Sequence, residues 1–213
     1  MAKRKLTARA KMADKSGNPL PEAGAYHARL VGIIEMGTQT MEFDGELREE
    51  ERMYFAWELL GHPLPGTKRN HVIGLDCLPS LHKKAKLLHL AEGMLGKNLV
   101  PEAQYDPVDW LGTYCKLTVA ENEGGWPFVK STGPADPGKP RYKSMIEPVS
   151  LTLDDVRKGG IVIVPTWLPQ LFGRFLGDVI AEAVEWTPQE RAWLSGPKPH
   201  EPAPDAIPEA EAV

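Results

Sequence analysis

The sequence predicts a mainly β protein of the α+β class, in which a small five-stranded barrel carries one helix between its third and fourth strands. Apolar and polar residues alternate with a period of two in several short stretches rich in Val, Ile and aromatic residues, which is typical of half-buried strands. One stretch with helical spacing interrupts this series after three strands. The chain has 213 residues, 42% of them hydrophobic and 25% charged, which is enough for one such domain with appendages.

The first three strands are expected between residues 24 and 77. "GAYHARLVGIIEMG" (24–37) is a long β-prone stretch, and Gly32 in its middle suggests a bulge. "RMYFAWELL" (52–60) alternates strictly, and "HVIGLDC" (71–77) follows a turn-rich loop. In the second strand one phase is apolar and is expected to face the core: Met53, Phe55, Trp57 and Leu59.

A helix is expected next, in "PSLHKKAKLLHLAEGMLGKN", with Ser80 as its N-cap and Gly96 just after its last turn. Its apolar stripe consists of Leu81, Ala85, Leu88, Ala91 and Leu95. "GTYCKLTVA" and "WPFVKST" then supply the fourth and fifth strands. Three strands, a helix and two strands is the order of the OB-fold, a small barrel that binds oligonucleotides in many proteins.

The chain outside the barrel divides by composition. Residues 1–20 read as a flexible basic arm and residues 21–146 as the OB domain. Residues 147–195 read as a strand and helix extension packed on the barrel, and residues 196–213 as a disordered, Pro-rich acidic tail. The apolar face of the extension's helix is expected to consist of Leu168, Leu171, Phe172, Phe175, Leu176, Val179 and Ala183. Thr187, Pro188 and Glu190 form a capping-box pattern for a further short helix.

Several function classes find no support in the sequence. There is no Walker loop, no G-x-S-x-G motif, no nuclease-like pair of acids and no zinc spacing among the histidines, so we expect no enzyme, no cofactor and no metal. Cys77 and Cys115 are expected to be reduced core thiols.

No apolar run approaches the roughly 20 residues needed to span a bilayer, and the basic N-terminus lacks the apolar region of a secretory signal. We therefore expect no membrane association and a cytoplasmic location.

The formal net charge of −4 conceals a strong asymmetry. Residues 1–15 carry six basic side chains and one acidic one, and residues 66–143 carry eleven basic and eight acidic ones. Residues 22–60 carry three basic and nine acidic side chains, and the last thirteen residues hold four acids and no base. A polyanion ligand is therefore compatible with this chain, because a local basic stripe matters more than the total.

Five segments in a fixed order carry a resemblance to a known family. They are "LPEAGAYHARLVGIIEMGTQ", the R-x-x-x-x-W-E-L stretch at 52–60, "SLHKKAKL", "LGTYCKLTV" and the "STGP" exit, together covering roughly residues 20–150. In this order they resemble the phage-encoded single-stranded-DNA-binding proteins of OB-fold type. The resemblance implies a bacteriophage protein of DNA replication and recombination that coats transient single strands in the cytoplasm of the bacterial host. The long basic arm, the apolar helix near 168–185 and the "EAEAV" terminus depart from the family's pattern.

Binding of single strands without sequence preference needs a positive groove for phosphates and flat side chains on which bases stack. Residues of both kinds occupy the polar phase of the expected strands. The candidate DNA-binding set is Arg29, Arg52, Tyr54, Tyr114, Lys116, Trp126, Phe128 and Lys130. Two alternatives stay open: the aromatics cap the barrel or pack on the C-terminal helix, or they form a protein interface in a non-enzymatic module of a phage replication complex. Trp57 and Trp110 are expected in the core, and Trp167, Trp186 and Trp193 in the core or a subunit interface.

Further phosphate contacts are expected from exposed bases, and partner contacts from the tail. The bases are Lys68, Arg69, Lys83 and Lys84, with Lys3, Arg4 and Lys5 of the arm. The tail's acids are Glu201, Asp205, Glu209 and Glu211, which either recruit replication proteins or fold back over the DNA groove. Gly173 and Gly177, with G-x-x-x-G spacing, suit close helix packing or a homodimer contact.

Overall fold

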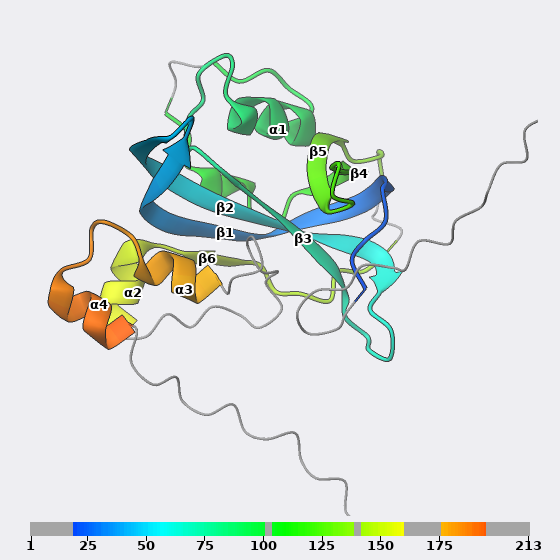
Figure 1. Ribbon diagram of the computed structural model, residues 1–213. Coiled ribbons are helices and arrows are strands. Elements are labelled where there is room, and N and C mark those ends of the chain that lie inside the picture. The colour runs from blue at the N-terminus through cyan, green and yellow to red at the C-terminus, as the bar shows by residue number, and fades with distance from the viewer. Residues whose placement is uncertain (1–18, 101–103, 139–141, 160–175, 195–213) are drawn as a thin grey trace, which may run out of the picture.

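The computed structural model describes residues 19–100, 104–138, 142–159 and 176–194, except for the side chains of residues 192–194 (Figure 1). The strands are β1 (Gly24–Phe43), β2 (Glu46–Pro63), β3 (Asn70–Cys77), β4 (Tyr114–Glu121), β5 (Pro127–Pro134) and β6 (Val149–Leu151). The helices are α1 (Lys86–Leu95), the 3₁₀ turn η1 (Pro107–Trp110), α2 (Leu153–Gly159), α3 (Leu176–Ala181) and α4 (Pro188–Leu194). The arm, the acidic tail, and the Leu168, Leu171, Phe172 and Phe175 part of the expected apolar helix lie outside the described residues.

The strands form one sheet in the order β3-β2-β1-β4-β5, with every neighbouring pair antiparallel, and β6 pairs with β1 in parallel. The prediction of a mainly β protein with short helices is thereby confirmed. The two edge strands, β3 and β5, come within 8 Å of each other at their Cα atoms. No hydrogen-bonded pairing joins these two edges among the described residues.

Strand β1 is the centre of the sheet because it changes partners along its length. It pairs with β2 from Ala28 to Phe43, with β4 from Gly24 to Arg29, and with β6 from Gly32 to Ile34. A register shift between Leu30 and Gly32 marks the change, which confirms the bulge expected from the glycine. A second shift, between Glu35 and Gly37, precedes a long two-stranded ribbon that ends at residues 44–45.

The inner core lies between one face of the sheet and α1 (Figure 1). The second-strand residues that were expected inside, Met53, Phe55, Trp57 and Leu59, are all buried there, and so is Trp110. Gly93 allows α1 to approach β5, because a Cβ at this position would lie 2.4 Å from the carbonyl oxygen of Thr132. The Thr132 hydroxyl in turn donates a 2.6 Å hydrogen bond to the carbonyl of Leu90.

The helix begins later than its sequence predicts. Ala85 is the N-cap of α1 and makes no side-chain cap, whereas the Ser80 hydroxyl accepts a 3.2 Å hydrogen bond from the His82 amide in a preceding turn. The expectation that Ser80 starts the helix is therefore wrong, and Lys83 and Lys84 lie before α1. The C-terminal expectation is confirmed, since Gly96 caps the helix in the left-handed conformation at φ 66°.

An outer core covers the opposite face of the sheet with residues of α2, α3 and the turn after α3. Its buried members are Ile34, Met36, Tyr54, Ala56, Val156, Leu176, Val179, Ile180, Ala183 and Trp186. The Trp186 indole donates a 2.7 Å hydrogen bond to the carbonyl of Ile180, which satisfies its only polar atom. The described part of the C-terminal extension thus packs on the sheet. None of the described helices has the length and apolarity to cross a membrane.

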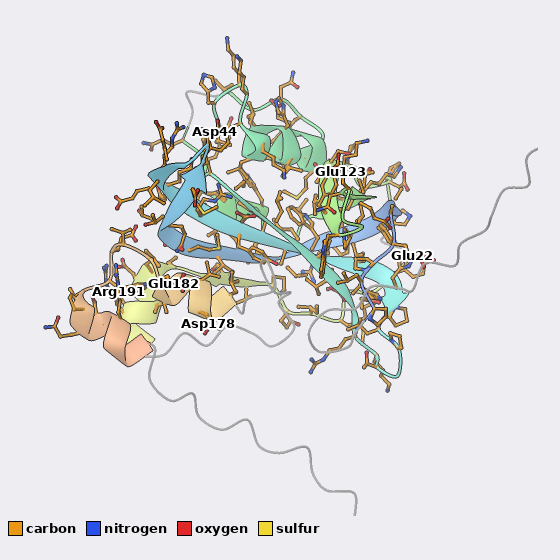
Figure 2. The ribbon with its side chains drawn as sticks, in the orientation of Figure 1. Glu22, Asp44, Glu123, Asp178, Glu182 and Arg191 are labelled. Atoms are coloured by element: carbon orange, nitrogen blue, oxygen red, sulfur yellow. The ribbon has the colours of Figure 1, made fainter. Side chains whose placement is uncertain are left out.

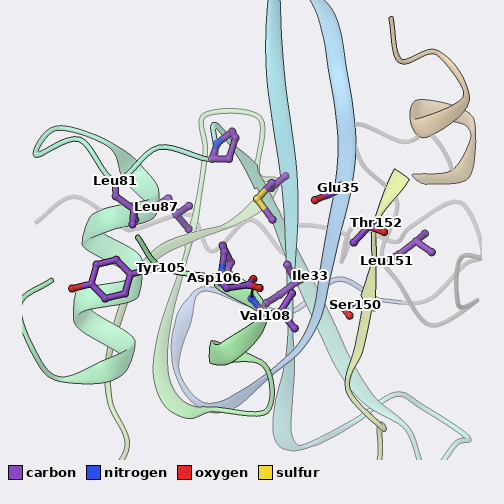
Figure 3. A pocket seen from close by; sticks show the side chains of 13 residues that line it. Ile33, Glu35, Leu81, Leu87, Tyr105, Asp106, Val108, Ser150, Leu151 and Thr152 are labelled. Atoms are coloured by element: carbon purple, nitrogen blue, oxygen red, sulfur yellow. Dashed lines mark hydrogen bonds between the residues drawn. The ribbon is translucent and has the colours of Figure 1, made fainter. Parts of the chain in front are cut away.

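A cavity of about 270 Å³ lies at the edge of the inner core, between the α1 side of the sheet, η1 and β6 (Figure 3). Ile33, Met53 and Leu87 are among its apolar lining residues. Its two carboxylates already accept backbone hydrogen bonds, Glu35 from the Leu153 amide at 3.0 Å and Asp106 from the Val108 amide at 2.9 Å.

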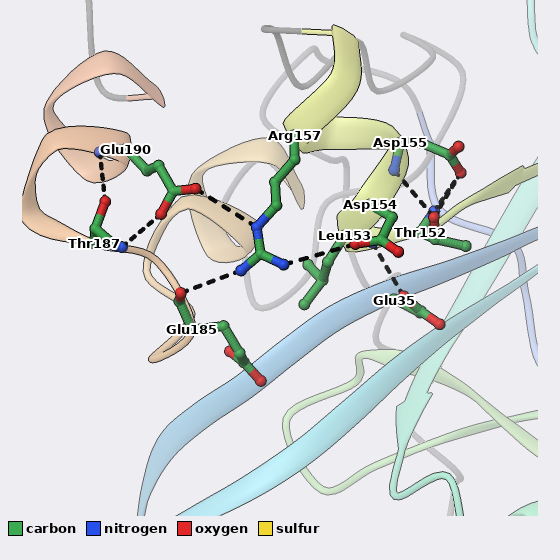
Figure 4. A network of polar contacts seen from close by, with 9 residues as sticks. All are labelled: Glu35, Thr152, Leu153, Asp154, Asp155, Arg157, Glu185, Thr187 and Glu190. Atoms are coloured by element: carbon green, nitrogen blue, oxygen red, sulfur yellow. Dashed lines mark hydrogen bonds and ion pairs between the residues drawn. The ribbon is translucent and has the colours of Figure 1, made fainter.

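Polar contacts fasten the C-terminal extension to β1 (Figure 4). Both carboxylate oxygens of Glu185 accept from the Thr38 amide, at 2.8 and 2.9 Å, and one accepts from the Thr38 hydroxyl at 2.6 Å. Burial opposes ionisation, but these hydrogen bonds and the nearby Arg157 leave the pKa of Glu185 below its usual value. The Thr187–Glu190 capping box is confirmed by reciprocal hydrogen bonds of 2.8 and 3.2 Å.

Replacing Trp186 with Ala should lower the free energy of unfolding by about 3–5 kcal/mol, because the ring fills the outer core and the cavity left behind is costly. Urea denaturation followed by circular dichroism measures the change. Trp126→Ala is the matched control, since Trp126 is 49% exposed and Trp186 only 3%. Equal effects of the two substitutions would contradict the burial of Trp186.

Both cysteines should be unreactive in the folded protein. Burial raises the pKa of Cys77 to about 11 and that of Cys115 to about 12, so the reactive thiolate is scarce at pH 8. A thiol reagent at pH 8 should modify neither residue in the native state and both in urea. Rapid native labelling, located by mass spectrometry, would show that the inner core opens easily.

Candidate nucleic-acid interface

The outward face of β4 begins the candidate interface. Cys115, Leu117 and Val119 are buried, whereas Lys116 is exposed and Tyr114 and Thr118 are partly exposed. This alternation confirms the phase expected from the sequence, because side chains two residues apart lie on the same face of a strand. The described C-terminal helices pack over β2 and the second half of β1, and none of their described residues packs on this face of β4.

Strand β1 supplies the neighbouring row. Arg29 is paired with Tyr114 and His27 with Lys116, so these four side chains share the outward face. The guanidinium of Arg29 lies 5.3 Å from the ring centroid of Tyr114, and its Nε donates a 3.1 Å hydrogen bond to the carbonyl of Gly112. A positive charge is thereby held over a flat ring at the edge of the face.

The β4–β5 hairpin supplies the exposed aromatic side chains. Trp126 is 49% exposed and Phe128 is 38% exposed, whereas Val129 is buried. The Trp126 amide donates to the Asn122 side chain at 2.9 Å, and its carbonyl accepts from the Asn122 amide at 3.0 Å. These contacts fix the backbone of the turn, so the indole is presented from a defined position.

We call this surface the outer strip. Lys130 is included because it is exposed and follows Phe128 closely in the hairpin. It is the extra residue of a β-bulge, since its neighbours Val129 and Ser131 pair with β4 and Lys130 does not. The outer strip comprises His27, Arg29, Tyr114, Lys116, Trp126, Phe128 and Lys130. Six of these were expected from the sequence to bind DNA, and the structure brings them together on β1, β4 and the β4–β5 hairpin.

An acidic residue occupies part of the outer strip. Asp136 accepts a 2.6 Å contact from the ammonium group of Lys116, and both side chains are about half exposed. The hydrogen bond from Lys116 lowers the pKa of Asp136 below its usual value, helped by the charges of Lys116 and His27. The ion pair is open to solvent, so a phosphate group can compete with Asp136 for Lys116.

Tyr142 also borders the outer strip, and the sequence reasoning missed it. Its ring centroid is 6.4 Å from that of His27. It covers Gly61, where the φ of 78° favours glycine and an added Cβ would lie 2.9 Å from the tyrosine ring. The only sequence signal was an aromatic residue between Arg141 and Lys143, in a stretch without a strand pattern.

The expectation that Arg52 and Tyr54 lie on the binding face is wrong. Tyr54 is 1% exposed in the outer core, where burial and the nearby Asp76 raise the pKa of its hydroxyl. Arg52 is mostly buried and forms ion pairs with Asp76 and, at 3.2 Å, with Glu50. Both residues do lie opposite the apolar phase of β2, but α2 and α3 pack over that face.

The remaining phosphate candidates lie on other elements than the outer strip or outside the described residues. Lys68 and Arg69 are exposed in the β2–β3 loop, and Lys83 and Lys84 are exposed before α1. The arm residues and the tail acids named above are not among the described residues. The cavity near η1 has no basic lining residue and therefore does not suit a phosphate. No group of three potential metal ligands occurs in the described ranges.

Comparison with known proteins assigns neither a family nor a function to this chain. No protein-family model matches the chain, and no curated protein is significantly similar to it. Function is therefore inferred from the geometry of the outer strip and from the order of the strands.

Proposed function

We propose that this protein binds single-stranded DNA without strong sequence preference, through an OB-type barrel whose outer strip carries the DNA. It performs no chemistry on the strand. The observation that carries the proposal is the outer strip itself, in which exposed Phe128 shares a sheet face with Arg29 and Lys116, and exposed Trp126 and Lys130 lie on either side of Phe128 in the same hairpin.

The strand order supports the OB part of the proposal. An OB barrel closes by pairing its third and fifth strands, with the helix between the third and fourth strands at one end. The order β3-β2-β1-β4-β5, with α1 between β3 and β4, is that arrangement opened at one seam. The edges that would meet there already approach within 8 Å.

The chemistry of the outer strip supports the ligand class. Bases of any sequence present a flat face, and stacking on an aromatic side chain contributes about 1–3 kcal/mol per base. Trp126, Phe128 and Tyr114 offer such faces. Lys116, Lys130 and Arg29 offer charges for the phosphates between stacked bases. The resemblance to phage single-stranded-DNA-binding proteins supports a role in phage replication and recombination.

The experiment that tests the proposal is a titration of tryptophan fluorescence with oligo-dT and with a matched duplex, at two salt concentrations. Quenching by the single strand, weaker binding of the duplex and loss of affinity at higher salt are expected from stacking and counterion release. Absence of binding to either nucleic acid at low salt, in fluorescence and in gel shift, would overturn the proposal. The aromatic face would then be a protein interface.

Trp126→Ala should weaken binding of a short oligo-dT by about 1–3 kcal/mol through the loss of stacking. Phe43→Ala is the matched control, because Phe43 is a 59% exposed aromatic residue far from the outer strip.

Lys116→Ala with Lys130→Ala should make the slope of log affinity against log salt shallower by about 1.4, at roughly 0.7 per phosphate on single strands. Lys97→Ala, an exposed lysine after α1, should leave the slope unchanged.

Asp136→Asn should strengthen binding of single strands at low salt, because it removes the carboxylate that competes with phosphate for Lys116. In the Lys116→Ala background the same substitution should have a much smaller effect. A full effect of Asp136→Asn without Lys116 would mean that Asp136 acts by general repulsion and that the ion pair has no part in it.

A further inference from the structure

A short segment, residues 142–146, runs beside the outer strip and leads into β6. We call this segment the strap. Its far end is fixed because β6 pairs with β1 at Gly32–Ile34. Its middle is fixed by Glu58 of β2, whose carboxylate accepts a 2.9 Å hydrogen bond from the Met145 amide and a second one from the Ser144 hydroxyl. The strap is therefore held to two strands of the sheet, and its side chains have defined positions.

The point of attachment lies next to the outer strip. Glu58 is paired with Arg29 across β2 and β1, so both side chains leave the sheet on the same face. Glu58 is fully buried, whereas Arg29, a member of the outer strip, is only partly buried. The strap therefore forms the border of the outer strip along β2.

Tyr142 continues the outer strip across β1. The residue is 37% exposed, and its ring centroid lies 6.4 Å from that of His27. His27 is paired on its other side with Lys116 of β4. Because Tyr142 also covers Gly61 of β2, it stands on the opposite side of His27 from Lys116. The three side chains thus form a row that crosses the strands.

The strap also supplies a positive charge. Lys143 is exposed and follows Tyr142 directly. The outer strip combines an aromatic ring with a nearby lysine twice, in Tyr114 with Lys116 and in Phe128 with Lys130. The strap repeats this combination, which suits a base and a neighbouring phosphate of a single strand.

The described part of the C-terminal extension lies away from this region. Figure 2 shows Glu22, just before β1, and Glu123, in the β4–β5 turn, at one end of the molecule, and it shows Asp178 and Arg191 of the extension at the other. The described helices of the extension therefore leave the beginning of β1 and Tyr142 beside it accessible.

We infer that the strap is a second stacking subsite for the single strand, in which Tyr142 stacks on a base and Lys143 contacts a phosphate. The inference rests on the proposed function and deepens it, because the strand then continues from β4 across His27 to the strap. The subsite adds no sequence preference, since every base has a flat face.

Binding of a labelled oligo-dT of about 12 nucleotides, within the roughly 4–16 that one OB fold covers, tests the inference by fluorescence anisotropy. Tyr142→Ala should weaken the affinity by about fivefold or more through the loss of stacking. Tyr142→Phe keeps the ring and should bind like the wild type. Tyr142→Leu keeps an apolar cover over Gly61 but has no aromatic face, so it should bind as weakly as Tyr142→Ala.

Met145→Ala is the matched control. Met145 is 53% exposed on the same strap, and it contacts Glu58 through its backbone amide, which the substitution retains. The affinity should therefore stay unchanged. Lys143→Ala should make the slope of log affinity against log salt shallower by about 0.7, the value for one phosphate on a single strand.

Tyr142→Trp reports contact with the strap directly. Trp126→Ala should remove much of the tryptophan quenching at saturating oligo-dT. Adding Tyr142→Trp to that variant should restore quenching, because a strand on the strap would stack on the introduced indole.

Wild-type affinity in Tyr142→Leu, equal losses in Tyr142→Leu and Met145→Ala, or no restored quenching at saturation would overturn the inference. If the wild type still binds and Trp126→Ala still weakens binding, the proposed function stands without the strap. Absence of oligo-dT binding by the wild type at low salt would instead overturn both the proposed function and the inference.

Discussion

The structure depends on burying both faces of the same two central strands. Ile33 and Phe55 lie in the inner core, and their sequence neighbours Ile34 and Tyr54 lie in the outer core. A sheet in this state needs a cover on each side, because each uncovered apolar side chain forfeits about 1.5–3 kcal/mol of burial free energy. Helix α1 supplies one cover and the C-terminal extension supplies the other (Figure 1).

The second cover decides which surface is available for binding. The turn after α3 lies against β1 at Gly37. A Cβ added at Gly37 would lie only 2.7 Å from the Cβ of Ala183, so glycine is needed for this close approach. Further along the outward face, buried Glu58 accepts hydrogen bonds from Asn70 at 2.7 Å and from the Met145 amide at 2.9 Å. These contacts close the face of β2. The surface that the described residues leave uncovered is the beginning of β1 with β4 and β5, and it carries the outer strip.

The distribution of charge follows the same division. The outer strip gathers basic and aromatic side chains at one end of the sheet, whereas Glu42, Glu49 and Glu51 lie on one face of the β1–β2 ribbon at the other end. A net charge of −4 describes neither surface.

The sequence by itself determined the period-two phases of the strands, the bulge at Gly32, the end of α1 at Gly96 and the aromatic and basic residues of β4 and β5. These are local properties, set by which side chains share a face and by backbone conformations that favour glycine. The tertiary structure decided what covers each face. Thr38 and Glu185, which fasten the outer cover, are 147 residues apart in the chain. An alternating pattern separates the two faces of a strand. It carries no information on whether the polar face is exposed to water or covered by a helix that is distant in the sequence. For this reason Tyr54 lies buried in the outer core and Tyr114 lies on the surface, although both occupy the polar phase of their strands.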